Sequence, residues 1–391
     1  MIDDPDTIYL DGNSLGRLPV ATRDRLAALV DQWGSWLVRA WHDWIDLPAR
    51  VGDELAEAAL GARPGEVIVS DSTTVNLFKL ASAALDNAHG ARTIVTDAGN
   101  FPTDRYVLDG LARQRGMELR LFDADPITGP QLDDVELACR TGDVGLVCLS
   151  HVAYRSGALA DIATITREAG APVLWDLSHA VGVVPIELNE WGVELAVGCT
   201  YKYLNGGPGA PAFLYVRREH QERLRTPIQG WFGQREQFAM ERPYDPEPGI
   251  RRFLAGTPPI LDLTAVQAGV ELVADAGIRS LWTKAVALTN LIVELHDEWL
   301  APLGFELGSP RDPERRGGHV SLRHDHAWPI ARAMVERAGV IPDFRDPDLI
   351  RLGVSPLYTR VVDVWDALDR LRGLVERGEQ RDVDSARTRV T

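Results

Sequence analysis

The chain has 391 residues, of which 45% are hydrophobic and 25% charged, and its 57 acidic and 41 basic residues give a formal net charge of −16. These proportions are typical of a globular protein and exclude a disordered, collagen-like or coiled-coil chain. The negative charge argues against a nucleic acid or an anionic membrane as the main partner. No apolar run approaches the roughly 20 residues that span a bilayer.

Two further features bear on the cellular compartment. The acidic N-terminus lacks the pattern of a signal peptide. The three cysteines share no CxxC spacing, which favours buried thiols over a disulfide or a metal site. We therefore expect a cytoplasmic protein.

Short apolar runs alternate with helical patterns over the first two thirds of the chain. This alternation predicts an α/β fold with a mostly parallel sheet covered on both faces. Ligands of such sheets bind at the carboxyl ends of the strands. The predicted strands are 66–70, 92–96, 118–122, 145–150, 172–176, 194–199 and 212–216, and helices between them include 73–87, 103–115 and 162–169.

The pattern changes near residue 262. Helical patterns over 262–276 and 278–299 meet at Gly277, and strand-like runs at 318–323 and 349–354 precede a last helix over 361–377. We therefore predict an N-terminal segment (1–50) packing on the small domain, a large α/β domain (51–260), a small α+β C-terminal domain (261–377) and a flexible tail (378–391).

The scarcity of lysine directs attention to one residue. Only Lys79, Lys202 and Lys284 occur among the 41 basic residues. Lys202 follows a predicted strand, stands between two tyrosines and precedes a glycine-rich loop. Lys79 and Lys284 fall inside helical patterns, where a solvated lysine is expected.

Asp176 ends a predicted strand 26 residues before Lys202, one strand–helix–strand step earlier. Both side chains can therefore lie at the same edge of the sheet. A lysine that forms a Schiff base and an aspartate that keeps a pyridine nitrogen protonated are what pyridoxal phosphate requires. The alternatives are a solvated loop lysine and an aspartate that caps the next helix.

Two weaker signals suit the same cofactor. Thr73 and Thr74 begin a helix after the first predicted strand, where backbone N–H groups and the helix dipole favour a phosphate. An ordinary helix cap explains them equally well. Phe101 follows the second strand and could stack on a planar ring, although an aromatic residue in such a loop more often belongs to the core.

Six segments, taken together, resemble the kynureninase family of fold-type-I pyridoxal-phosphate enzymes. They keep the family's order along the chain. Aminotransferases and cysteine desulfurases share the aspartate–lysine pair but not the YKYLN and GWFG segments together. The segments are 9–16 (YLDGNSLG), 74–77 (TVNL), 101–104 (FPTD), 200–205 (TYKYLN), 230–233 (GWFG) and 356–358 (PLY).

The resemblance implies a role for each matching residue around pyridoxal 5′-phosphate. Lys202 is the Schiff-base lysine, Asp176 pairs with the pyridine nitrogen, and Tyr201 contacts the phosphate and relays a proton. It also implies a homodimer with shared active sites, in which the neighbouring subunit supplies the last two of the following residues. The remaining cofactor-binding residues are Thr73, Thr74, Phe101, Pro102, Thr103, Asp104, Ser150, His179, Trp231 and Thr257.

The resemblance also implies a substrate site. Arg351 binds the substrate α-carboxylate as a bidentate fork, although without the resemblance a surface arginine would be the better interpretation. Trp41, Gly256 and Thr257 resemble the bacterial form, which prefers kynurenine to 3-hydroxykynurenine. Asn13 belongs to the same set.

The implied reaction is the hydrolytic cleavage of the Cβ–Cγ bond of L-kynurenine, or of 3-hydroxykynurenine. The products are L-alanine and anthranilate or 3-hydroxyanthranilate, in tryptophan catabolism and the kynurenine pathway to NAD. The nearest alternative is another fold-type-I enzyme, such as a cysteine desulfurase or an aminotransferase.

More distant alternatives are weaker. A nicotinamide-dependent oxidoreductase needs GxGxxG after the first strand, and residues 71–76 contain no glycine. A metal hydrolase could use His319, His324, Asp325 and His326, but no HExxH spacing is present. A non-catalytic binding module requires that the cofactor be absent.

Overall fold

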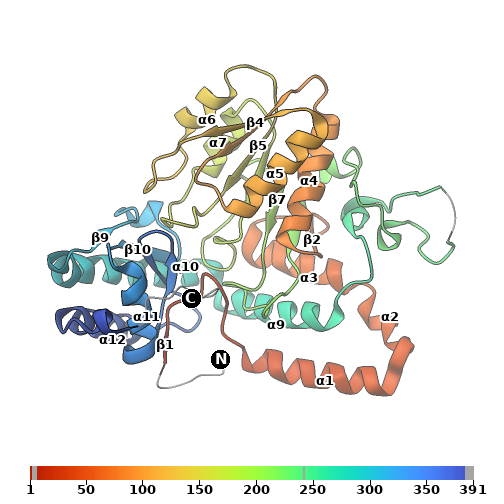
Figure 1. Ribbon diagram of the computed structural model, residues 1–391. Coiled ribbons are helices and arrows are strands. Elements are labelled where there is room, and N and C mark those ends of the chain that lie inside the picture. Colours follow the sequence, from red (N-terminus) through yellow and green to blue (C-terminus); the bar gives the residue numbers. More distant parts are fainter. Residues whose placement is uncertain (2–6, 241–242, 384–391) are drawn as a thin grey trace.

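The computed structural model describes residues 1, 7–240 and 243–383. Its larger body is built on a seven-stranded sheet with the strand order β2-β8-β7-β6-β5-β3-β4 (Figure 1). Only β8 runs antiparallel to its neighbours. The strands are β2 (Val67–Val69), β3 (Thr93–Asp97), β4 (Glu118–Phe122), β5 (Val144–Ser150), β6 (Val173–Asp176), β7 (Leu195–Gly198) and β8 (Phe213–Val216). All seven predicted strands and the α/β fold class are confirmed.

Helices cover both faces of this sheet because alternate strand residues point to opposite sides. On one face, Ile94 and Leu146 pack with apolar residues of α4 and α5. On the other, Val95 and Val147 pack with residues of α3, α6, α7 and α9. These helices are α3 (Leu47–Leu55), α4 (Thr73–Asn87), α5 (Pro102–Arg115), α6 (Leu132–Cys139), α7 (Ile162–Glu168) and α9 (Ile260–Ala276), and the short α8 (Arg218–Gln221) follows β8.

The smaller body is an antiparallel four-stranded sheet with its own apolar core. Its order is β12-β13-β10-β9, formed by β9 (Glu306–Leu307), β10 (His319–Arg323), β12 (Asp343–Arg345) and β13 (Leu349–Gly353). The helices packed on it are α10 (Ile278–Leu295), α11 (Ala327–Ala338) and α12 (Val361–Glu376). The helix predicted to end at residue 299 leaves α-helical geometry after Leu295 and continues as a π-turn, His296–Leu300.

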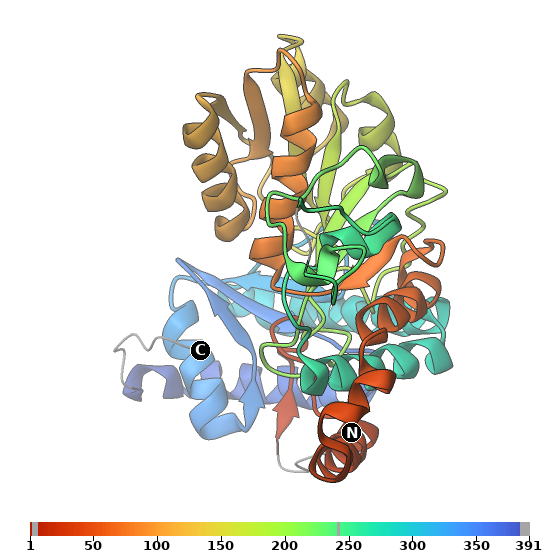
Figure 2. The ribbon, with the colours of Figure 1, turned by 90° about the vertical axis from the view of Figure 1, so that its right-hand side faces the viewer.

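The N-terminal segment contacts both bodies. β1 (Ile8–Tyr9) pairs with β11 (Val340–Ile341) of the smaller body. α1 (Val20–Trp36) packs against α9, and α2 (Trp41–Trp44) links it to α3. In Figure 2, α1 and the green segments near residues 225–240 and 243–255 lie on the same side of the molecule.

The segment predicted to be a flexible tail begins with ordered structure. Residues Glu379–Asp382 form a short 3-10 helix, and Arg337 of α11 donates hydrogen bonds to the carbonyls of Glu379 and Asp382. Residues 384–391 lie outside the described part of the chain. Among the described residues, no helix is long and apolar enough to cross a membrane.

Candidate active site

A cavity of about 350 Å³ opens where β5 and β6 end, at the carboxyl edge of the sheet. This is the edge where parallel sheets bind ligands. Ten of the residues predicted to form the site line it: Thr73, Thr74, Phe101, Thr103, Asp104, Ser150, Asp176, His179, Tyr201 and Lys202.

Lys202 lies in the turn after β7. The Lys202 ammonium nitrogen is 6.0 Å from the ring centroids of both Phe101 and Tyr201. Among the described residues, no side chain forms a hydrogen bond or an ion pair with this nitrogen. Burial lowers the pKa of Lys202, and Arg351 and Arg345 lower it further, against the opposing effect of Cys199 and Asp176. The structure therefore favours the neutral, nucleophilic amine.

Asp176 ends β6 beside a second carboxyl group, Asp104 of α5. Both are buried, at 6% and 2% exposure. Burial and the neighbouring Asp176 raise the pKa of Asp104 well above its ordinary value. Of the two carboxyl groups, Asp104 is therefore the one whose protonated form is favoured by its surroundings. The carboxylate of Asp176 is also oriented by Ser178, whose backbone N–H donates to Asp176 Oδ1 at 2.8 Å.

Two further ionisable side chains of the cavity are held neutral. Burial, followed by the charge of Lys202, lowers the pKa of His179 well below its ordinary value. The neighbouring Cys199 and burial raise the pKa of Tyr201. At neutral pH, His179 is therefore an uncharged imidazole and Tyr201 keeps its phenolic proton.

The N-terminus of α4 borders the cavity through Ser72, Thr73 and Thr74. The first N–H groups of a helix have no partner within the helix and favour an anion. Ser72 caps the helix by accepting a hydrogen bond from the backbone N–H of Val75 at 3.3 Å, and the N–H groups of the two threonines are not used by this bond.

Lys79 stabilises the start of the same helix, and the expectation that Lys79 is solvated is wrong. Its side chain is fully buried. Its ammonium nitrogen donates to Asp71 Oδ2 at 2.5 Å and to the carbonyl of Phe253 at 2.7 Å. Asp71, just before the helix, has a positive φ of 51°. The ion pair therefore fixes the loop that leads into α4.

Asn100 orders the opposite wall, a role that sequence analysis missed. Its Oδ1 accepts hydrogen bonds from Ser150 Oγ at 2.6 Å and from the backbone N–H of Phe101 at 2.8 Å. Its Nδ2 donates to Thr96 Oγ1 at 3.2 Å. The residue therefore links β3, the end of β5 and the loop that carries Phe101.

Comparisons with known proteins agree with this geometry. A model described as the kynureninase C-terminal domain matches residues 281–371. A kynureninase from Pseudomonas fluorescens is 44% identical over 382 residues, which cover 95% of this chain and 89% of the relative. One from Burkholderia pseudomallei is 43% identical over 381 residues, 94% of this chain and 89% of that protein. The chain belongs to the kynureninase family.

Solved structures show the same fold at greater distance. A cysteine desulfurase from Thermococcus onnurineus superposes with a TM-score of 0.81 at 18% identity, over 95% of each chain. The cystine C–S lyase C-DES superposes at 0.82 with 18% identity, over 94% of this chain and 98% of that chain. These superpositions establish the fold-type-I architecture. At 18% identity they say nothing about the reaction, for which the kynureninase relatives are the relevant comparison.

Two residues expected at the kynureninase substrate site, Arg351 and Asn13, do not line the cavity. Arg351 of β13 is 1% exposed and is bonded to Asp343 and to the carbonyl of Tyr154. Asn13 is fully buried against Gly353, and neither atom of its amide group has a hydrogen-bond partner in the described structure.

The remaining predicted residues do not line the cavity either. Pro102 begins α5, next to the cavity-lining Phe101 and Thr103. Trp41 packs on Phe232, with ring centroids 6.1 Å apart. The structure leaves the other three positions, Trp231, Gly256 and Thr257, accessible on the surface.

Some cavity residues were not predicted. Tyr154 follows the end of β5, and its ring meets Phe101 edge-on with centroids 5.3 Å apart. The sequence signal available for Tyr154 and Val152 was their position just after a predicted parallel strand. The others are Ser72, Ser178, Gly209 and Ala210, which neighbour predicted residues or lie in the glycine-rich loop.

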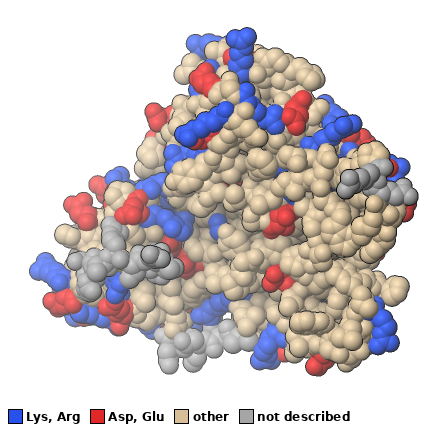
Figure 3. All heavy atoms as spheres, turned by 45° about the vertical axis from the view of Figure 1, so that its right-hand side comes forward, with Lys and Arg blue, Asp and Glu red and all other residues tan. Residues whose placement is uncertain are grey.

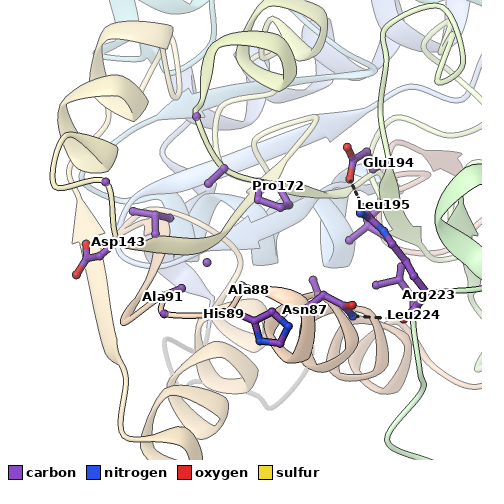
Figure 4. A pocket seen from close by; sticks show the side chains of 17 residues that line it. Asn87, Ala88, His89, Ala91, Asp143, Pro172, Glu194, Leu195, Arg223 and Leu224 are labelled. Atoms are coloured by element: carbon purple, nitrogen blue, oxygen red, sulfur yellow. Dashed lines mark hydrogen bonds and ion pairs between the residues drawn. The ribbon is translucent and has the colours of Figure 1, made fainter.

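A second, larger cavity of about 570 Å³ lies at the amino ends of the same strands (Figure 4). It is bordered by Val144 and Leu195, which begin β5 and β7. Glu194 and Arg223 face each other there at 3.6 Å, with 37% and 55% of their side chains exposed. No lysine or buried carboxylate of the described chain borders it.

Proposed function

We propose that the chain hydrolyses the Cβ–Cγ bond of L-kynurenine to anthranilate and L-alanine, with pyridoxal 5′-phosphate as its cofactor. The observation that carries this proposal is the 44% identity with a kynureninase over nearly the whole chain. The cavity adds independent support, since it brings the scarce Lys202 together with the strand-end Asp176.

The residues present fit the cofactor. When bound, pyridoxal phosphate supplies an aldehyde that captures the substrate amine and a ring that accepts electrons from bonds at its Cα. The buried carboxyl group of Asp176 suits the pyridine nitrogen, and the raised pKa of the neighbouring Asp104 favours the protonated form of that second carboxyl group. The N-terminus of α4, with Thr73 and Thr74, suits the phosphate.

Lys202 and Tyr201 handle protons in this proposal. Because its pKa is lowered, Lys202 has an uncharged fraction that can remove the Cα proton of the substrate. Tyr201 lines the cavity and retains its phenolic proton at neutral pH, so it can donate that proton when water adds to the γ-carbonyl. His179 adds no charge beside the ring.

We further propose that two copies of the chain assemble and share active sites, and that the enzyme works in the cytoplasm, as three free cysteines favour. Trp231 is 38% exposed and Phe238 71% exposed. On the side seen in Figure 3, broad areas carry no charged side chain. Further exposed apolar residues of the N-terminal helices, including Trp33, Trp36, Leu37 and Val38, suit burial against a second copy.

The activity is tested by incubating the holoprotein with L-kynurenine and following anthranilate fluorescence. We expect anthranilate and L-alanine in equal amounts. A protein that binds pyridoxal phosphate but releases sulfur from cysteine, and no anthranilate from kynurenine, would contradict the proposal and favour the desulfurase alternative. The three cysteines all belong to the described part of the chain and none of them lines the cavity, which disfavours that outcome.

Sharing of sites is tested by mixing two inactive variants, one at Lys202 and one at Trp231. If Trp231 serves the neighbouring subunit, each mixed dimer contains one intact site of two, and an equal mixture, in which half of the dimers are mixed, recovers up to about a quarter of the activity. Labelled subunits establish that exchange has taken place. An absence of recovery after proven exchange would contradict shared sites.

A further inference from the structure

The guanidinium of Arg351 already has two buried partners. Its Nε donates to Asp343 Oδ2 at 2.5 Å, and its Nη2 pairs with the same oxygen. Its Nη1 donates to the backbone carbonyl of Tyr154, also at 2.5 Å. The side chains of Arg351 and Asp343 are each 1% exposed. A buried charge this well satisfied is held in one orientation.

The small sheet itself brings the two charges together. Asp343 of β12 stands directly opposite Arg351 of β13 in the antiparallel register. Directly opposite residues project from the same face with their Cβ atoms roughly 5 Å apart. The aspartate therefore reaches the guanidinium from a rigid strand and not from a loop.

The three contacts leave part of the guanidinium free. It carries five N–H donors, one on Nε and two on each terminal nitrogen. The bonds to Asp343 use one hydrogen on Nε and one on Nη2, and the bond to Tyr154 uses one on Nη1. One hydrogen therefore remains on each terminal nitrogen, which is the pair that binds both oxygens of a carboxylate.

The bond to Tyr154 connects this free edge with the cavity. Tyr154 lines the cavity, and its ring packs edge-on against Phe101. Arg155, the next residue, donates to the carbonyl of Asp346 at 2.8 Å, in the turn between β12 and β13. The cavity wall and the hairpin that carries Arg351 are thus tied together.

We propose that Asp343 is the positioning residue of the substrate-carboxylate site, fixing the plane of the Arg351 guanidinium so that its two free N–H groups face the α-carboxylate. The proposal rests on the proposed function, because it takes Arg351 as the carboxylate ligand. Asp343 acts through Arg351 and does not itself contact the substrate.

The test compares Asp343→Asn with Asp348→Asn in the holoprotein. Asp348 supplies a matched control, because it lies beside the same sheet and pairs with the half-exposed Arg323 at 2.9 Å. Binding of L-alanine and of L-alaninamide, which lacks the carboxylate, is followed by the absorbance of the bound cofactor. The KM and kcat for L-kynurenine are measured in parallel.

We expect Asp343→Asn to weaken L-alanine binding and to raise the KM for kynurenine by roughly tenfold or more, with kcat changed by less than about threefold. Binding of L-alaninamide should stay within about twofold, so the preference for the carboxylate falls. Asp348→Asn should leave all these quantities near their wild-type values. Unchanged L-alanine binding in Asp343→Asn, or an equal loss for the amide, would overturn the proposal.

Asp343→Glu keeps the charge but moves it by one methylene group, and it provides the test if the asparagine variant does not fold. The same loss of preference is expected, and wild-type preference would overturn the positioning role. Failure of the proposed function has a different signature, namely no anthranilate from the wild-type protein. In that case, L-alanine binding by Asp343→Asn still tests whether Asp343 positions Arg351.

Discussion

The two cavities at opposite edges of the large sheet differ in chemistry more than in size. The cavity at the amino edge is the larger, at about 570 Å³ against 350 Å³. Its charged side chains, Glu194 and Arg223, are partly exposed and face each other. At the carboxyl edge, Lys202 and Asp176 lie close to Asp104, whose pKa is raised, and to His179, whose pKa is lowered.

This difference teaches that burial, and not cavity volume, marks the reactive edge. Burial shifts the pKa of Lys202, Asp104 and His179 towards their uncharged forms. Asp143, at the amino edge, has its pKa lowered instead by a hydrogen bond from the Thr141 hydroxyl, and it stays ionised. Neutral amines and shared protons are useful in catalysis, whereas solvated ions are not.

The largest effect is expected at Lys202. Lys202→Ala removes the amine that moves the Cα proton, so kcat should fall by roughly 10³-fold or more. The measurement is anthranilate release by the purified variant with added cofactor. Lys284→Ala, in the half-buried middle of α10, is the control and should keep most of the activity. Wild-type turnover in the Lys202→Ala variant would remove the basis of the comparison.

The two carboxyl groups should respond unequally to the same change. Asp176→Asn removes the carboxyl group proposed to face the pyridine nitrogen and should lower kcat by roughly 10²-fold or more. Because the raised pKa of Asp104 favours its protonated form, Asp104→Asn introduces an uncharged amide of similar shape, and a loss below about tenfold is expected. Steady-state kinetics at pH 7 check the order. The reverse order would place the charge on Asp104.

Burial also shifts the pKa of Asp11, a carboxyl group near Arg351, and this shift affects folding stability. Burial, and then the charge of Asp343, raises the pKa of Asp11 from 3.8 to about 7. The folded state therefore binds this proton more tightly than the unfolded state does. The stabilisation is complete below about pH 4 and is lost as the pH rises through 7.

Asp11→Asn should be insensitive to this titration. The free energy of unfolding of the variant should therefore gain on that of the wild type between pH 4 and 7, by at most about 4 kcal/mol. Urea unfolding at several pH values measures the difference. Parallel curves for the two proteins would show that Asp11 is ionised in the folded state throughout.

The smallest effect is expected at the amino edge. Arg223→Gln and Glu194→Gln remove a partly exposed ion pair of the larger cavity, and such pairs contribute about 0–1 kcal/mol. We expect kcat/KM to stay within about twofold of wild type. A large loss of kcat/KM in either variant, with folding intact, would show that the larger cavity also contributes to catalysis.

Sequence was informative where local chemistry decides the outcome. Most strands of the large sheet are short apolar runs because both of their faces are buried, and each of the seven strands lies at a predicted position. Lys202 stood out because the chain has so few lysines, and Asp176 because it ends a strand. The helices of the first 50 residues were not predicted, because α1 leaves apolar residues such as Trp33 exposed and so lacks a clear buried stripe.

The undetected features depend on contacts between distant segments. Lys79 is buried because Asp71 and the carbonyl of Phe253 meet its ammonium group. Asp343 contacts Arg351 because the strand register places the two residues opposite each other, and this register cannot be read from the sequence. Tyr154 contributes a backbone carbonyl, a group that every residue possesses.

Borohydride reduction shows whether Lys202 is the amine that holds the cofactor aldehyde. The protein with bound pyridoxal phosphate is reduced, digested and analysed by mass spectrometry, and the sequence offers only three lysines as possible sites. We expect a phosphopyridoxyl group on Lys202 alone. A label on Lys79 or Lys284, with Lys202 unmodified, would contradict this expectation.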